Sequence, residues 1–288
     1  MVKKLIVGII AMLPFLADAQ SFYAIRRPRN LAVHGGSGTA LYKGELVNPK
    51  QLGRVRYNLV VGAEYLFSRR FTVRSELSWF RITGSDTDAN DDRVTRNLSF
   101  FSNSQELNAT GAVYFLREPK QFYKRSSVNG YAFLGVGAFR FNPKTEYKGE
   151  KYALQPLRTE GVDYSRFQIA IPYGVGVKIT IDVLHDLIIE AGYRTTFTDY
   201  LDDISVRNYP DPTTLSGPIS AALSNRRSEI NLDLPYTVGI RGNPKENDGY
   251  FLMNIKYQYY LPIQIGPNAE AKKYYRKKRK GVNKPFKK

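Results

Sequence analysis

Hydrophobic and polar residues alternate along much of the chain, and the alternation is longest in residues 167–197. From Phe167 to Ile181 every second residue is apolar, and the residues between them are small, polar or charged. Side chains that repeat every two residues lie on one face of a β-strand. After a short break at 182–186 the same alternation resumes. The stretch therefore predicts a β-hairpin with one continuously apolar face.

Both arms of this hairpin are long enough to cross a membrane, since a tilted strand needs about 9–11 residues to do so. We therefore predict that the apolar face lies against lipid. Similar segments recur along the chain and give eight predicted strands, at 31–46, 56–67, 71–79, 107–115, 131–147, 167–181, 187–197 and 251–261. In 131–147 phenylalanine, glycine and valine occupy both faces, so the pattern does not say which face is outward.

The connections between these segments alternate in length, and those after the first, third, fifth and seventh are long. Outer-membrane barrels place short turns in the periplasm and long loops outside the cell. The predicted fold class is therefore all-β, an eight-stranded antiparallel transmembrane β-barrel. An even number of strands places both chain ends on the periplasmic side.

Charged residues occupy the polar faces of these strands. In a barrel those faces line the lumen, where acids and bases can pair. We predict such pairing among seven side chains: Glu64, Arg74, Glu76, Lys178, Glu190, Arg194 and Lys256. A soluble β-sandwich, with the same charges facing water, is the alternative.

The composition is compatible with a barrel and excludes other classes of protein. The 288 residues include no cysteine, which excludes disulfides, thiol catalysis and cysteine metal sites. A mean hydropathy of -0.39, with no internal apolar run near ~20 residues, excludes a bundle of membrane helices. Alternating strands average to a polar value, so a barrel remains possible.

The first residues predict an exported protein. Lys3 and Lys4 precede an apolar run at 5–16, and Ala17-Asp18-Ala19 resembles a signal-peptidase site. The predicted organisation is a signal peptide at 1–19, a periplasmic leader at 20–30, the barrel at 31–262 and a tail at 263–288. The predicted location is the bacterial outer membrane, with its lipid as the first partner.

The tail is strongly basic, and the whole chain carries a net charge of +17. Its densest part holds Lys272, Lys273, Arg276, Lys277, Lys278, Arg279 and Lys280, and no acid follows Ala271. Such a run is typical of binding to nucleic acid or anionic surfaces, but an exported protein meets no genome. Two interpretations remain: a solvated extension, and a docking segment for an acidic periplasmic partner or anionic lipid.

Residues that could support chemistry are few. Asp199, Asp202 and Asp203 follow the strand at 187–197 and could hold a cation, but aspartate at a strand exit more often caps a turn. We favour that structural role. His34 and His185 accompany no Gly-x-Ser-x-Gly or His-Glu-x-x-His pattern. The protein is therefore predicted not to be an enzyme, with no catalytic residue, cofactor or metal.

One motif carries a resemblance. Residues 192–203 read Gly-Tyr-Arg-Thr-Thr-Phe-Thr-Asp-Tyr-Leu-Asp-Asp. They accompany Tyr-Lys-Gly-Glu-Leu at 42–46, Phe-Leu-Gly-Val-Gly at 133–137, and Arg-Gly-Asn-Pro at 241–244 before Asp-Gly-Tyr at 248–250. Together these segments resemble the PorG-like family of outer-membrane barrels of the type IX secretion system in Bacteroidota. The resemblance implies a barrel that links the outer membrane to a periplasmic ring of PorK and PorN in the secretion and gliding machinery.

The resulting hypothesis is a non-enzymatic anchor for a periplasmic assembly. A small pore, a lipid enzyme and a barrel of unrelated role are the alternatives. An eight-stranded barrel leaves an interior only wide enough for side chains, which disfavours conduction. No recognisable nucleophile and base pair supports a lipid enzyme.

Overall fold

Eight long strands dominate the computed structural model, which describes residues 29–46, 56–88, 92–232 and 234–263. The strands are β1 (Leu31–Lys43), β2 (Tyr57–Leu66), β3 (Phe71–Ser85), β4 (Ser99–Tyr114), β5 (Val128–Arg140), β8 (Phe167–Thr180), β9 (His185–Thr196) and β10 (Gly249–Tyr260). The predicted signal peptide, most of the predicted leader and the tail from residue 264 onward lie outside the described residues.

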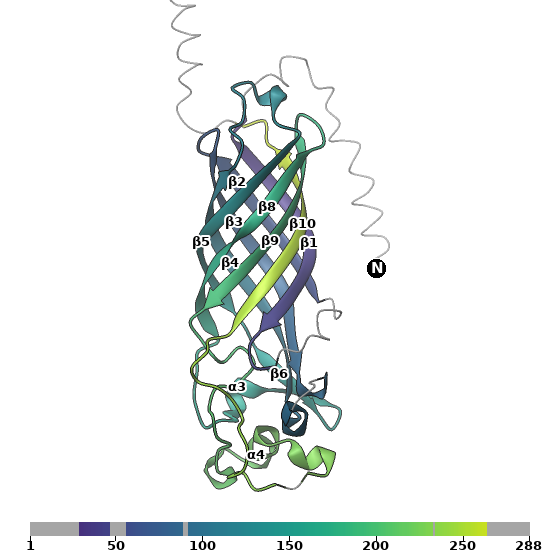
Figure 1. Cartoon of the computed structure of the whole chain (residues 1–288), viewed down its shortest axis with the longest axis vertical. Helices are drawn as coiled ribbons and strands as arrows, with labels where there is room; N and C mark the ends of the chain where they lie inside the picture. The colour runs from purple at the N-terminus through teal and green to yellow at the C-terminus, as the bar shows by residue number, and fades with distance from the viewer. Residues whose placement is uncertain (1–28, 47–55, 89–91, 233, 264–288) are drawn as a thin grey trace, which may run out of the picture.

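The eight strands close into an antiparallel barrel, which confirms the predicted fold class (Figure 1). Consecutive strands pair, β5 pairs with β8, and β1 pairs with β10 to complete the ring. Because Ala32 lies opposite Tyr260, β1 begins at the same end of the barrel where β10 ends. We call this end, which also carries the short turns, the turn end, and the opposite one the loop end.

The outer surface of the barrel is apolar, as the alternation predicts. In β8, Ile169 and Val175 are exposed, whereas Ala170 and Lys178 are buried. The other strands follow the same rule, with exposed apolar side chains that include Leu59, Val61, Val73, Leu107 and Ile255. A soluble β-sandwich buries its apolar face and exposes its polar one, so this distribution excludes that alternative.

Side chains fix the short turns at the turn end. The Ser68 hydroxyl accepts hydrogen bonds from the backbone amides of Arg70 and Phe71, at 3.2 and 3.0 Å. The Asp182 carboxylate accepts from the amides of Leu184 and His185, at 2.6 and 3.0 Å. Serine and aspartate favour turns for this reason. Each turn aligns the two strands that it connects.

Four connections meet at the loop end and form a cap, made of the described parts of residues 44–56, 86–98, 141–166 and 197–248 (Figure 1). The cap contains β6 (Pro143–Tyr147), β7 (Glu150–Ala153), α3 (Leu154–Leu157), α4 (Pro218–Ser224) and the 3₁₀ helices η3 (Asp86–Asp88), η4 (Asp92–Arg96), η6 (Pro212–Thr214) and η7 (Arg227–Ile230). One further 3₁₀ helix, η5 (Phe122–Lys124), lies at the turn end. Of the helices in the described residues, none has both the length and the apolar character needed to cross a membrane.

Buried arginines hold the cap together. Arg226 donates to the Thr145 hydroxyl of β6 at 2.8 Å. Arg241 forms an ion pair with Glu160 and donates to the backbone oxygen of Ser224 at 3.2 Å. These contacts join segments far apart in the sequence, so the cap is a packed layer with its own polar core.

Two predicted boundaries are wrong. The connection between the predicted strands at 71–79 and 107–115 is shorter than predicted, because β3 runs to Ser85 and β4 begins at Ser99. Alternate polar residues of β4 point into the lumen, where Ser102 and Ser104 share a hydrogen bond. The predicted strand at 131–147 is two strands: β5 ends at Arg140, and Pro143, which has no amide hydrogen to donate, starts a separate strand that pairs with β7.

The outward face of β5, which the sequence left open, carries Leu134 and Val136, while Tyr131 and Phe133 point inward. Glycines on neighbouring strands make room for these rings. Tyr131 lies opposite Gly176 in the register, and a Cβ at Gly176 would approach the tyrosine ring to 2.4 Å. The glycines of β8, which have no side chain, thus decide which face of β5 is internal.

Candidate functional site

The charged side chains predicted to face the lumen meet there and form ion pairs. Arg74 lies 2.6 Å from Glu190. Lys256 lies 2.8 Å from Glu190 and 2.5 Å from Glu76. Two further pairs complete the set that we call the lumen network: Lys178 with Glu64 at 2.8 Å and Arg194 with Glu106 at 3.5 Å. The predicted pairing is confirmed for six of the seven side chains, whereas Arg194 pairs with Glu106, which the prediction did not include.

Hydroxyls and one imidazole extend the lumen network to every barrel strand. Tyr131 of β5 donates to Glu190 at 2.6 Å, and Tyr250 of β10 donates to Glu106 at 2.6 Å. His34 of β1 lies 2.8 Å from Glu76. A buried charge is tolerated only when it is paired and hydrogen-bonded. The network meets this condition and cross-links the wall of the barrel through its centre.

Apolar clusters occupy the interior on either side of the ion pairs. At the loop end, Phe80 and Phe139 pack with Leu201 of the cap. At the turn end, Phe122 of η5 packs with Tyr260, with their ring centroids 5.0 Å apart. An interior filled in this way is suited to rigidity rather than to transport.

Two of the three aspartates in the predicted motif have the structural role that the sequence favours. Asp202 accepts from the amide of Ile204 at 2.9 Å. Asp203, which adopts φ 68°, accepts from the Tyr164 hydroxyl at 2.6 Å. Burial of the Asp203 carboxyl group raises the pKa of Asp203 to about 6. Both side chains therefore hold the cap in place.

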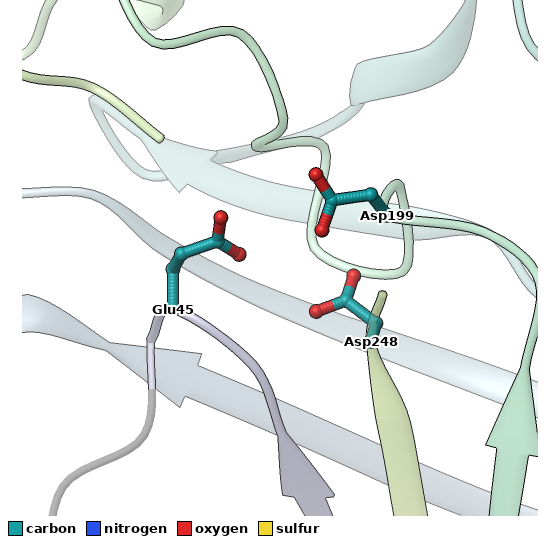
Figure 2. Close-up of side chains that lie close together, drawn as sticks. All are labelled: Glu45, Asp199 and Asp248. Carbon is teal, nitrogen blue, oxygen red and sulfur yellow. The ribbon is translucent and has the colours of Figure 1, made fainter. Parts of the chain in front are cut away.

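Asp199 faces other acids and, unlike its two neighbours, has a carboxylate with no hydrogen-bond partner in the described residues. Asp199, Glu45 and Asp248 place one carboxylate oxygen each within 4.8 Å of one another, and Figure 2 shows the three side chains directed toward a common gap. We call them the acidic trio. Glu45 follows β1, Asp199 follows β9 and Asp248 precedes β10, so the trio joins three strand ends at the loop end.

Burial and like charges act together on the acidic trio. Burial, followed by the charge of Glu45, raises the pKa of Asp199 to about 7. Burial also raises the pKa of Glu45 and, more strongly, that of Asp248. The three oxygen ligands are of the type that binds hard cations. This is the group within the described residues whose geometry suits a metal ion.

The turn end carries positive charge. A pocket of about 340 Å³ opens there, and its lining includes one acid, Glu118, and five bases: Arg29, Arg69, Lys120, Arg125 and Lys178. Arg125 is held by Asp186 at 2.6 Å. β10 ends at Tyr260 at this same end, and Tyr260 itself lines the pocket. The seven tail residues predicted to bind a partner, Lys272 to Lys280, lie outside the described residues.

Residues 35–215 match a protein family, DUF6089, which is described as a domain of unknown function. The chain belongs to the DUF6089 family. The match covers the barrel from β1 to β9 and reaches into the cap, so it includes Glu45 and Asp199 of the acidic trio. No curated protein matches this DUF6089 member.

Solved outer-membrane proteins resemble this DUF6089 barrel only distantly. Ail of Yersinia pestis has 12% identity and a TM-score of 0.36, with 81% of this chain and 100% of that chain covered. OprG of Pseudomonas aeruginosa has 9% identity and a TM-score of 0.38, with 82% and 98% covered. Neisserial surface protein A has 9% identity and a TM-score of 0.38, with 80% and 97% covered. The fold assignment rests instead on the strand pairing of the chain.

Sequence reasoning missed three acids of these sites: Glu45, Glu106 and Asp248. Glu106 lies immediately before the predicted strand at 107–115, and its spacing of two from Asn108 was a detectable signal for the lumen face. Glu45 and Asp248 lie 203 positions apart, counted from their numbers in the sequence. No local pattern relates residues at that distance, and only closure of the barrel brings them together.

Proposed function

We propose that the protein is a non-conducting outer-membrane barrel that anchors a periplasmic assembly. The observation that carries this proposal is a combination: an apolar exterior around an interior crossed by the lumen network. The exterior suits lipid, and the interior supplies stiffness. The protein acts as a fixed point in the membrane rather than as a conduit.

The location rests on the outer surface. Exposed Ile169, Val175 and Leu134 belong to an apolar wall that surrounds polar side chains, and in water such a wall would drive association. In the proposed orientation the turn end faces the periplasm and the cap faces outside the cell, because outer-membrane barrels have short periplasmic turns. Both chain ends are then periplasmic.

The assembly that we propose is the periplasmic ring of the type IX secretion and gliding machinery. The motif at 192–203 and its companion segments support it by resemblance to the PorG-like family. The basic tail and the basic pocket at the turn end support a partner with an acidic surface. The proposed partners are therefore PorK/PorN-like ring proteins, and the protein has no catalytic role.

Cross-linking and recovery of the barrel from intact cells test this partnership. We expect ring proteins to be recovered with the full chain and at least tenfold less with a chain that lacks residues 271–288. A control replaces the tail by one with the same bases in scrambled order, which separates net charge from a specific docking sequence. Unchanged recovery after the deletion would remove the tail from the mechanism.

Planar-bilayer recording tests the non-conducting barrel. The purified full chain should show no steady ion-sized conductance, because the lumen network spans the interior. A variant with Glu190→Ala and Arg74→Ala provides a comparison in which part of the network is removed. Steady conductance by the unmodified chain would favour the pore and contradict the anchor.

A further inference from the structure

The acidic trio is built into the cap by contacts that aim its carboxylates at one another. The Tyr42 hydroxyl lies 2.6 Å from one oxygen of Asp248, and the amide of Leu201 donates to the other at 2.9 Å. The amide of Asn243 donates to Glu45 at 2.9 Å. These bonds come from three different segments, so the arrangement is not a consequence of local sequence.

Asp199 provides a second observation, independent of the clustering of the acids, that points to a bound cation. Only 7% of its surface is exposed, and neither of its carboxylate oxygens has a hydrogen-bond partner within the described residues. A buried carboxylate without a partner is costly. Figure 2 shows that this carboxylate points toward Glu45 and Asp248.

We propose that the acidic trio is a calcium-binding site, in which Glu45, Asp199 and Asp248 each contribute a carboxylate oxygen to one Ca²⁺ ion. Ca²⁺ accepts carboxylate oxygens at about 2.3–2.6 Å, so two of its ligands can lie up to about 5 Å apart. The 4.8 Å limit within the trio falls inside this span. The absence of nitrogen and sulfur donors in the trio argues against zinc.

The proposed ion has a mechanical effect on the cap. Its ligands follow β1, follow β9 and precede β10, and β10 lies between β1 and β9 in the barrel. Ca²⁺ would therefore tie the exits of three adjacent strands and hold the segments of the cap that contain Leu201 and Asn243. Calcium binding is thus expected to hold the cap segments together at the loop end without changing the structure of the barrel.

Amide hydrogen exchange on the purified full chain in detergent tests the site. The reporters are the amides of Leu201 and Asn243, which bond to Asp248 and Glu45. Extracellular calcium modules bind at about 10⁻⁴–10⁻³ M, so titration from a chelator to ~10 mM Ca²⁺ covers the range. At a concentration about 100-fold above Kd, exchange at these reporters should slow about 100-fold, while β8 amides should not change.

Asp199→Asn and Glu45→Gln should each weaken the calcium dependence at least tenfold. The matched control is Asp163→Asn, an exposed acid of the same cap, which should respond like the unmodified chain. Exchange in β8 shows whether a variant still folds. In chelator, Asp199→Asn should leave exchange at the reporters unchanged or slower, because the substitution removes one of three like charges.

Three outcomes would overturn the proposal. The first is no slowing by Ca²⁺ in the unmodified chain, and the second is the same slowing in Asp199→Asn. Either result would mean that the carboxyl groups of the acidic trio bind protons instead of a cation. The third is equal protection by Mg²⁺ at the same concentration, which would refute the assignment to calcium. Sodium chloride at matched ionic strength separates binding from screening.

Discussion

Two sets of carboxylates, all buried except the half-buried Glu45, occupy the molecule under opposite conditions. In the lumen network, Glu64, Glu76, Glu106 and Glu190 each lie within 3.5 Å of a lysine or arginine. In the acidic trio, the carboxylates face one another, and no ion pair of the described residues includes Asp199 or Asp248. The carboxylates of the lumen network therefore form ionic cross-links, whereas those of the acidic trio concentrate negative charge in the cap.

The difference shows why burial alone does not identify a binding site. A paired acid such as Glu190 already has its counter-charge, so it stabilises the wall and has no need of a ligand. Asp199 and Asp248 have no ion pair among the described residues, and such acids require protons or a cation from solution.

The largest effect is expected from Glu190→Gln, which leaves Arg74 and Lys256 without one of their acids. Breaking a buried pair costs about 3–5 kcal/mol, and the free energy of unfolding in urea should fall by that amount. Glu150→Gln, on the exposed hairpin of β6 and β7, is the control. An equal loss in both variants would mean that the lumen network does not cross-link the wall.

The next largest effect is expected from Gly176→Ala, which tests how tightly side chains fill the lumen. Gly176→Ala places a methyl group 2.4 Å from the Tyr131 ring, and overpacking of this kind costs about 1–3 kcal/mol. Gly111→Ala is the matched control, because the nearest atom to its Cβ lies 4.0 Å away. Urea unfolding of both variants provides the comparison. Similar stabilities would indicate a loosely packed interior.

In the cap, Tyr42→Phe removes the hydroxyl that bridges Asp202 and Asp248, at 2.7 and 2.6 Å. Loss of a buried hydrogen bond costs about 1–2 kcal/mol, so the amides of Leu201 and Ile204 should exchange about tenfold faster. Barrel amides should not respond. Tyr57→Phe, which removes an exposed hydroxyl of β2, should leave both regions unchanged, and a response throughout the barrel would show that cap and wall open together.

The smallest effect is expected from Asp163→Asn. Arg158 and Asp163 are 2.7 Å apart, nearly the same separation as Arg74 and Glu190 at 2.6 Å, but both side chains are at least half exposed. Exposed pairs contribute less than about 1 kcal/mol, so the urea unfolding midpoint should barely move. A loss as large as that of Glu190→Gln would show that distance matters more than burial.

The barrel was predictable because its signals are local. Alternation in β8, β9 and β10 gave the outward and inward faces, and the charged residues on the inward faces gave most of the lumen network. Predictions failed where polar side chains face a polar lumen. In β4 the run from Ser102 to Glu106 resembles a loop in composition, although it is a strand in which Ser102, Ser104 and Glu106 point inward.

The cap was not predictable in the same way. The sequence indicated Asp199, Asp202 and Asp203 as one group and favoured a structural role for all three. The structure separates them: Asp202 and Asp203 bind groups of the cap, whereas Asp199 faces Glu45 and Asp248. The calcium proposal therefore departs from the prediction of no metal, which stays open until it is tested.

Alternation of period two was enough to establish the strands, their lipid-compatible face and the charge of the interior, since each depends on neighbours within one strand. Which residues meet within each site depended on closure of the barrel. Pairing of β1 with β10 brings Glu45 close to Asp248 across most of the chain length, and the glycines of β8 select the inner face of β5. Such contacts arise from packing between strands, and residues that pack against each other need not be near in sequence.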